Sequence, residues 1–214
     1  MWLAVVSQPF QQGAEIPRPG KLDQNLGEFW SSNPWSIVSE GNNLSAFERN
    51  RVFLNVKGQD FVDISHLTGA DSDGDGRSVV AADFRNIGMP DLIVRQAGGG
   101  PLILYENRLP KRHYLNVTLR GRQSNRQGVG ARLTAVVKGQ PLVRELYPAN
   151  SFRSQAPNVV HFGLGDADAV ESLTIRWPSG KVQVLKDVKG DRHIVVDEGT
   201  DAVETVVPGR TIAP

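Results

Sequence analysis

The chain has 214 residues, with 24 lysines and arginines against 23 aspartates and glutamates, a formal net charge of +1 and no cysteine. This length allows one large or two small domains with a buried apolar core, and the balanced charge, with no basic run longer than Lys111-Arg112-His113, argues against nucleic acid as a partner. The absence of cysteine excludes disulfides, thiolate metal sites, cysteine nucleophiles and covalent c-type haem attachment.

Residues 1–48 are polar and predict an extended N-terminal arm. The apolar run from Trp2 to Val6 is too short for the apolar segment of a signal peptide. No stretch approaches the ~20 apolar residues of a membrane helix, so we expect no transmembrane segment. Trp30 and Trp35 each carry a large apolar side chain, which favours docking of the arm onto this chain's own core or, as the alternative, onto a partner surface.

Short strands follow from residue 49, separated by turns rich in Gly, Pro and Asp. Several of them alternate polar and apolar residues, as strands with one solvated face do, and no window has a helical period. We therefore predict an all-β chain with a sandwich or barrel in its second half. The predicted strands are residues 51–55, 61–64, 79–83, 91–94, 102–105, 114–119, 131–137, 142–146, 159–162, 172–177, 182–185 and 193–196.

One turn in the second half has a clear stereochemical basis. In Trp177-Pro178-Ser179-Gly180, Pro178 presets φ at the second turn position and Gly180 suits the fourth. The turn should join strands 172–177 and 182–185 as a hairpin. The tail after Asp197 is polar and contains Pro208, so we expect it to fray.

A loop in the first half has the spacing of a calcium site. Asp71, Asp73 and Asp75 stand at alternate positions before Gly76, and Ca²⁺ takes six to eight oxygen ligands, which such loops supply. An EF-hand would need another acid at the twelfth position, where Ala82 stands instead. Ca²⁺ is thus the one candidate cofactor, and a solvated Gly-Asp turn is the alternative.

A second loop, from Asp83 to Asp91, keeps acids at its ends but has Arg85 and Ile87 where alternation would place two more. The fixed positive charge of Arg85 would repel Ca²⁺ and could neutralise both carboxylates. We expect a metal-free turn held by hydrogen bonds, with Asp83 and Asp91 as the weaker metal candidates.

No catalytic constellation stands out in the remaining residues. The four histidines are far apart in sequence, which argues against a preformed zinc site, and His161 reads as a half-buried structural residue. Arginines early in the second half, among them Arg126, Arg132 and Arg153, indicate either a solvated face or a surface for an acidic partner. A hydrolase or lyase working through an acid pair is the outlying alternative. The pairs are Asp71 with Asp73 and Asp83 with Asp91.

Short motifs in the first half carry a resemblance to a known repeat. They are Asn50-Arg51-Val52-Phe53-Leu54-Asn55, Phe61-Val62-Asp63, Asp75-Gly76-Arg77, Ala81-Ala82-Asp83-Phe84 and Pro90-Asp91-Leu92-Ile93-Val94. Over residues 49–110 they resemble one FG-GAP/VCBS-type repeat, a single blade of a β-propeller. The resemblance implies a calcium loop at residues 83–91, of which this chain keeps only the two end acids.

A second set of motifs lies in the second half. They are Gly121, Ser124-Asn125-Arg126, Gly128-Val129-Gly130-Ala131-Arg132, Ser154-Gln155, His161-Phe162-Gly163-Leu164-Gly165 and Arg176-Trp177-Pro178-Ser179-Gly180. They resemble the ASPIC/UnbV domain of cartilage acidic protein-like and related bacterial proteins, over residues 111–198, which leaves 199–214 as a flexible tail. The resemblance implies export, extracellular or to the bacterial periplasm or cell surface, with a signal peptide absent or already removed.

A solitary blade has two exposed edges and buries neither face alone, so it must pack on the ASPIC-like half, on the arm or on another chain. We therefore expect a non-catalytic interaction module that is an accessory or structural subunit of a larger assembly. Its partners would be proteins or a second copy of the chain, and any membrane association would run through a partner. The alternative is an adhesion-type domain that binds carbohydrate or another ligand and holds a structural calcium ion.

Overall fold

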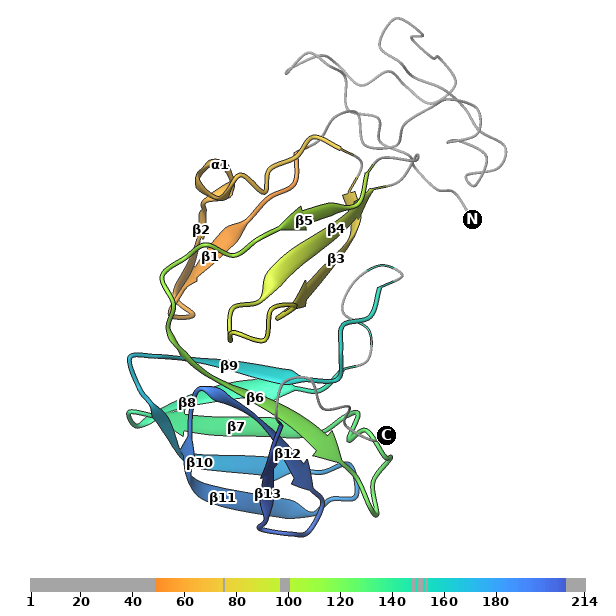
Figure 1. The fold of residues 1–214 in the computed structure, drawn as a ribbon, viewed down its shortest axis with the longest axis vertical. Coiled ribbons are helices and arrows are strands. Elements are labelled where there is room, and N and C mark those ends of the chain that lie inside the picture. Colours follow the sequence, from red (N-terminus) through yellow and green to blue (C-terminus); the bar gives the residue numbers. More distant parts are fainter. Residues whose placement is uncertain are drawn as a thin grey trace, which may run out of the picture. The chain divides into compact units, whose positions relative to one another are not determined.

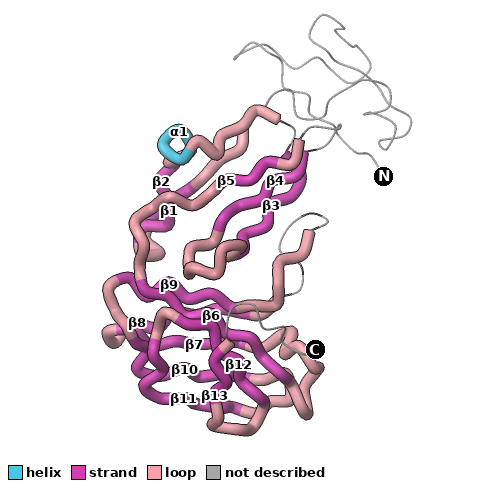
Figure 2. Tube along the Cα trace, in the orientation of Figure 1, coloured by secondary structure: helices cyan, strands magenta, loops and turns pink. Residues whose placement is uncertain are grey.

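A computed structural model describes residues 49–74, 76–96, 101–147, 149, 152 and 154–206 (Figures 1 and 2). The chain divides into two compact units. Unit 1 comprises Met1–Val79 and Ile93–Tyr105, and unit 2 comprises Val80–Leu92 and Glu106–Pro214. The predicted arm, with Trp30 and Trp35, lies outside the described residues.

The structure begins with a hairpin in unit 1. Strands β1 (Phe53–Val56) and β2 (Asp60–Asp63) pair antiparallel. Lys57 and Gly58 between them have φ of 52° and 74°, the combination that a type I′ turn requires. A single helical turn, α1 (Ser65–Thr68), follows the hairpin. Helix α1 was not predicted, because four residues are too few to display a helical period.

A three-stranded sheet comes next, with the order β3-β4-β5. Its strands are β3 (Gly76–Ala82), β4 (Asp91–Gln96) and β5 (Ile103–Tyr105). The loop between β3 and β4 is the second of the two predicted metal loops, and it belongs to unit 2 together with the adjoining ends of both strands.

Unit 2 is a β-sandwich of two four-stranded sheets, ordered β11-β10-β7-β8 and β13-β12-β6-β9. Neighbouring strands are antiparallel except for β12 and β6, which are parallel. The predictions of an all-β chain and of a sandwich in the second half are confirmed. The strands are β6 (His113–Arg120), β7 (Arg132–Val137), β8 (Gln140–Glu145), β9 (Val160–Gly165), β10 (Ala169–Arg176), β11 (Val182–Lys189), β12 (Arg192–Asp197) and β13 (Val203–Thr205).

The core of unit 2 lies between these two sheets. Leu115 and Phe162 enter it from one sheet, and Leu133 and Leu173 enter it from the other. All four side chains are fully buried, and each such burial stabilises the fold by about 1.5–3 kcal/mol. Trp177 also belongs to this core, and its indole N–H donates to Gln183 Oε1 at 3.0 Å, so the buried ring keeps its polar partner.

The turn predicted at residues 177–180 is present as a hairpin between β10 and β11. The Gly180 N–H donates to the Trp177 carbonyl oxygen at 2.9 Å, and Gly180 has φ of 88°. The expectation of a flexible tail over residues 199–214 is wrong for β13, which pairs with β12 in the register Ile194↔Thr205. Three residues are too short to reveal their alternation in the sequence.

Candidate functional site

The first predicted metal loop is partly described. Asp71 Oδ2 lies 3.1 Å from Arg49 Nη1 and 3.1 Å from His66 Nδ1. Asp73 is exposed, and Asp75 lies outside the described residues. A guanidinium and an imidazole thus occupy the Asp71 oxygen that a calcium ion would need. Within the described part of the chain, no group of three or more His, Asp or Glu side chains is placed to hold a metal ion.

The second loop is organised by Asp83 without a metal ion. Its Oδ1 accepts the Ile87 N–H at 3.0 Å, and its Oδ2 accepts the Gly88 N–H at 2.6 Å. Gly88 is buried with φ of 80°, and a Cβ atom there would lie 1.9 Å from Cδ1 of Tyr114. The loop therefore needs glycine at this position for both its backbone conformation and its packing against Tyr114.

Asp91, at the other end of this loop, is buried and paired with Arg85. Arg85 Nη2 donates to Asp91 Oδ1 at 2.8 Å, and Arg85 Nε donates to Asp91 Oδ2 at 3.3 Å. The same guanidinium also donates to Glu106 Oε1 at 2.7 Å. The expectation that Arg85 neutralises both carboxylates is confirmed for Asp91 and wrong for Asp83. The reason is that backbone N–H groups already satisfy both oxygens of Asp83.

A polar cluster covers the outer face of the sheet that contains β6. In the strand register His161 and His193 lie on either side of Asn116. His161 Nδ1 is 2.8 Å from Asn116 Oδ1, and His193 Nε2 is 2.7 Å from Thr118 Oγ1. Burial lowers the pKa of both histidines, and the negative charge of Asp83 opposes that shift only in part. Sequence separation concealed this pairing, although the prediction of a half-buried His161 is confirmed.

Within this cluster, Thr118 and His193 are the pair that most resembles a nucleophile and its general base. Nucleophilic catalysis also needs a third group that orients the base. Asp83 acts on both imidazoles by its charge, but its two oxygens are engaged by the loop backbone. The cluster therefore lacks the arrangement of a catalytic triad within the described residues.

Glu198 is the most heavily hydrogen-bonded carboxylate in the described part of the chain, and it was not predicted from the sequence. Its Oε2 accepts the backbone N–H groups of Arg122, Gln123 and Ser124 at 2.7–2.8 Å. Its Oε1 accepts the hydroxyls of Ser124 and Ser179 at 2.9 and 2.6 Å. Burial alone would raise the pKa of Glu198, but these hydrogen bonds outweigh it and lower that pKa to about 2.

Through these hydrogen bonds, the Glu198 side chain links three segments of unit 2. Glu198 follows β12 directly, whereas Ser124 lies in the loop after β6 and Ser179 lies in the turn after β10. Both serines belong to motifs that carry the ASPIC/UnbV resemblance. Their distance in sequence from Glu198 explains why sequence reasoning missed the carboxylate that they share.

The arginines predicted to bind a partner do not form one described cluster. Arg126 is exposed in the loop after β6, and Arg153 lies outside the described residues. Arg132 lies on β7, where its Nη1 is 3.8 Å from Glu145 Oε1 and where the register places it opposite Arg176 of β10. Trp30 and Trp35 lie outside the described residues as well.

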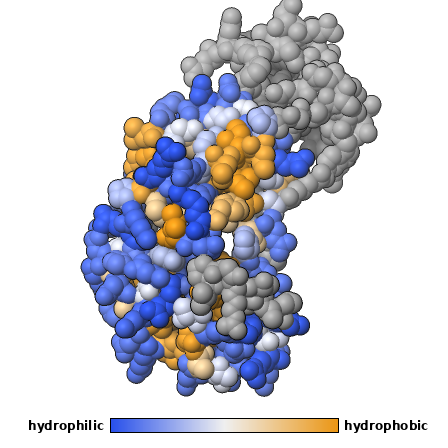
Figure 3. All heavy atoms as spheres, in the orientation of Figure 1, coloured by the Kyte–Doolittle hydropathy of each residue, from blue (hydrophilic) through white to orange (hydrophobic). Residues whose placement is uncertain are grey.

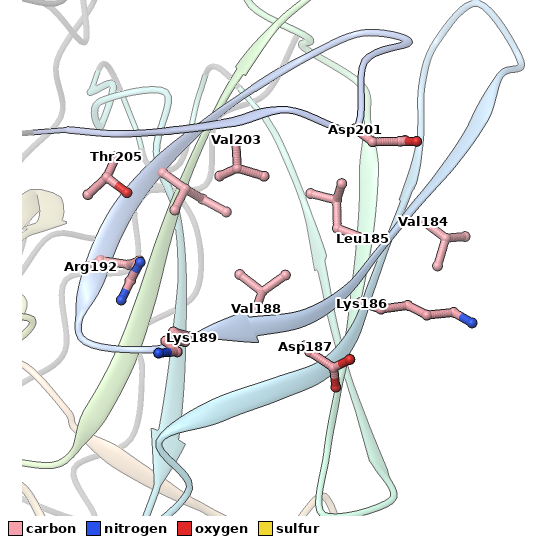
Figure 4. A pocket seen from close by; sticks show the side chains of 11 residues that line it. Val184, Leu185, Lys186, Asp187, Val188, Lys189, Arg192, Asp201, Val203 and Thr205 are labelled. Atoms are coloured by element: carbon pink, nitrogen blue, oxygen red, sulfur yellow. The ribbon is translucent and has the colours of Figure 1, made fainter.

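Unit 2 also has a groove of about 470 Å³ beside β11 (Figure 4). Leu185 and Val188 of β11 and Val203 of β13 provide apolar lining. Lys189 and Arg192 lie at one end of it, away from Asp201 (Figure 4). Asp187 and Asp201 are the two acids of this lining, and Figure 4 shows them apart from each other.

The described part of unit 1 exposes apolar side chains instead of burying them. Its buried apolar residues are Ala70 and Val94 alone. Figure 3 shows apolar side chains at the surface of this part of the chain. The large exposed ones are Phe53, Leu54, Val56, Phe61, Val62, Leu67, Val79, Leu102 and Leu104.

Comparison with known proteins finds one family match, which lies within the second half of the chain. Residues 121–203 match the family model described as ASPIC and UnbV. No curated protein matches the chain in sequence, and the FG-GAP/VCBS resemblance of residues 49–110 stays a prediction. No described helix is long and apolar enough to cross a membrane. Together with the sandwich and the predicted motifs within it, the match shows that residues 121–203 form an ASPIC/UnbV domain.

Proposed function

We propose that the chain is a non-catalytic, exported interaction module that serves as an accessory or structural subunit of a larger protein assembly. In this proposal the ASPIC/UnbV domain is the stable scaffold, and unit 1 supplies the binding surface. The observation that carries the proposal is the apolar surface of unit 1, whose described residues leave nine large apolar side chains exposed.

The hairpin of β1 and β2 is the centre of this surface. Leu54 pairs with Val62 on one face of the hairpin, and Phe53 and Phe61 lie on the other. These four side chains are 46–63% exposed. A two-stranded hairpin is at best marginally stable by itself in water, so a hairpin that is apolar on both faces favours packing against further protein.

Three observations support the absence of catalysis in this proposal. Asp71, Asp83 and Asp91 are held by arginine, histidine or backbone N–H groups. The two half-buried histidines contact an amide and a hydroxyl. The two acids that line the groove beside β11, Asp187 and Asp201, lie apart from each other (Figure 4). Export is proposed because ASPIC/UnbV domains are typically found in extracellular or exported proteins.

Static light scattering of the full chain over a range of concentrations tests the interaction surface. Without its partner, the wild-type chain should self-associate through the apolar side chains. Leu54→Glu combined with Phe61→Glu should keep it monomeric, because both positions are more than half exposed and the change costs no core packing. The matched control is Leu109→Glu with Tyr147→Glu, two apolar side chains of unit 2 that are even more exposed, and this variant should associate as the wild type does.

One result would count decisively against the proposal. It is a wild-type chain that stays monomeric at every concentration and does not bind a fluorescent dye specific for apolar surfaces. Association that is lost equally in the control variant would also contradict it, because the surface would then not be specific to unit 1.

A further inference from the structure

The outer face of the sheet β11-β10-β7-β8 carries a row of side chains fixed by the strand register. Arg176 of β10 is opposite Arg132 of β7, Val182 of β11 is opposite Arg176, and Glu145 of β8 is opposite Arg132. Residues opposite each other in adjacent antiparallel strands project from the same face, about 4.5–5.5 Å apart at their Cβ atoms. The row therefore reads Val182, Arg176, Arg132, Glu145 across the whole sheet.

Arg132 and Arg176 thus lie opposite each other on adjacent strands, and Glu145 is the one carboxylate in their row. Arg132 Nη1 lies 3.8 Å from Glu145 Oε1, and both side chains are more than half exposed. Arg176 is exposed and makes no ion pair or side-chain hydrogen bond with any described residue. Like charges directly opposite in a sheet are destabilising, so this sequence keeps an arrangement that the sandwich alone does not require.

The adjacent row on the same face is made of β-branched side chains. Val184 of β11 is opposite Thr174 of β10, Thr174 is opposite Thr134 of β7, and Thr134 is opposite Val143 of β8. Val184 and Val143 at its two ends are 47% and 39% exposed. The guanidinium pair therefore borders a strip of apolar methyl groups on an open sheet face.

We propose that this face, formed by Arg132, Arg176, Val182 and Val184, is a docking surface for an acidic protein segment whose carboxylates lie next to apolar side chains. Guanidinium groups bind carboxylates in a bidentate manner, and the uncompensated charge of Arg176 supplies the complementarity that attracts them. The valines contact the apolar side chains of the same segment. The surface is separate from the apolar hairpin of unit 1 and does not depend on the function proposed for it.

A protein segment fits this face better than a sulfated polysaccharide does. The chain carries a formal net charge of only +1, so it offers no extended positive field along which a polyanion would lie. Polyanion recognition also gains nothing from Val182 and Val184. A segment that presents two or three carboxylates together with apolar side chains uses every element of the face.

Binding measurements on the full chain at low ionic strength test the proposal. The probes are a random copolymer of glutamate and tyrosine, poly-glutamate and heparin. The copolymer should bind most tightly. Arg132→Gln combined with Arg176→Gln should weaken that binding at least tenfold. Lys57→Gln combined with Lys111→Gln, which removes the same charge from exposed positions outside this face, should change it less than twofold. Leu54→Glu with Phe61→Glu should bind the copolymer as the wild type does.

Thermal unfolding of the same variants separates docking from a structural role. Relief of the like-charge contact should leave Tm of the double arginine variant unchanged or raise it by about 1–4 °C. A fall in Tm would assign the pair to the fold and overturn the proposal. Equal loss of binding in the lysine control, or no binding of the copolymer, would overturn it too. Tighter binding of heparin that is lost with the arginines would replace the acidic protein segment with a sulfated polyanion.

Discussion

The two units of this chain use apolar residues in opposite ways. Unit 2 buries many of its leucines, isoleucines and valines in a core between two sheets, and even Trp177 is almost completely buried there. The described residues of unit 1 also include many large apolar side chains, but nine of these are exposed and only Val94 is buried. A closed core makes a scaffold, whereas an apolar surface is characteristic of a binding element. Stability and interaction are therefore expected to respond to mutations in different units.

The largest effect should come from a matched pair of phenylalanines. Phe162→Ala removes a fully buried ring from the core of unit 2 and should lower the free energy of unfolding by about 3–5 kcal/mol. Phe61→Ala removes a ring that is 63% exposed and should change it by about 0.5 kcal/mol or less. Urea denaturation followed by circular dichroism measures both. Equal losses of unfolding free energy in the two variants would contradict the proposed difference between a buried core in unit 2 and an exposed apolar surface in unit 1.

Glu198 should be the most sensitive polar position of unit 2. Glu198→Gln removes the charge and replaces one acceptor oxygen with an NH₂ group, which would face N–H or hydroxyl donors. The expected loss is about 2–3 kcal/mol. The control is Glu204→Gln, an exposed residue with a surface ion pair to Arg120, which should cost about 1 kcal/mol or less. Similar losses for the two variants would show that the shared hydrogen bonds of Glu198 contribute little.

The sequence predicted the sandwich because its strands are long enough for alternation to show. It missed β13 and α1, which span only three and four residues. It also missed Glu198, whose partner Ser124 is 74 positions away, because hydrogen bonds across such a distance leave no local pattern. The predicted role of Arg85 was right only for Asp91. Asp83 accepts hydrogen bonds from the backbone of its own turn instead, and residue types alone do not reveal that turn geometry.

The candidate surface on the sandwich could not be predicted from residue types, because it depends on the register of the strands. Arg132 was singled out as one arginine among several, but only the pairing of β7 with β10 places it opposite Arg176. A shift of one residue in that pairing would send the two side chains to opposite faces. The residue types were thus informative about chemistry, and the sheet topology was needed to decide which of them meet.

Gly88 tests the loop that covers the polar face of unit 2. Gly88→Ala introduces a Cβ atom at φ of 80° and 1.9 Å from the Tyr114 ring, so it should cost about 2–3 kcal/mol, more than conformational strain alone. The control is Gly139→Ala, which has φ of 72° but no atom within 4 Å of the added Cβ, and it should cost about 1–2 kcal/mol. Equal costs in urea denaturation would show that packing against Tyr114 is not needed.

Two contributions to the pH dependence of stability should come from unit 2. The folded state lowers the pKa of His161 and His193 below 6.5, so the unfolded chain binds more protons as the pH falls and stability begins to decline near pH 6.5. Glu198, with a pKa lowered from 4.5 to about 2, adds a second decline that starts near pH 4.5 and ends near pH 2.

Variants separate these two pH ranges. His161→Gln with His193→Gln should flatten the denaturation midpoint between pH 7 and 5 and leave the acid decline in place. Glu198→Gln should do the reverse. A double histidine variant that keeps the full decline between pH 7 and 5 would show that other groups are responsible.

The smallest effect is expected from calcium, and it concerns the loops at residues 71–75 and 83–91. Asp71 contacts Arg49 and His66, and Asp91 is paired with Arg85, so a calcium ion would have to displace cationic partners from both carboxylates. We expect Tm of the full chain to differ by less than about 1 °C between millimolar Ca²⁺ and a chelator, whereas a site saturated a hundredfold above its Kd would add about 2.7 kcal/mol to stability. A clear rise in Tm with Ca²⁺ that is lost in Asp73→Asn would reinstate the first loop as a metal site. A calcium ion bound there would also stabilise unit 1 without a partner. The measurement therefore tests whether unit 1 depends on a partner for its stability, as unit 2 does not.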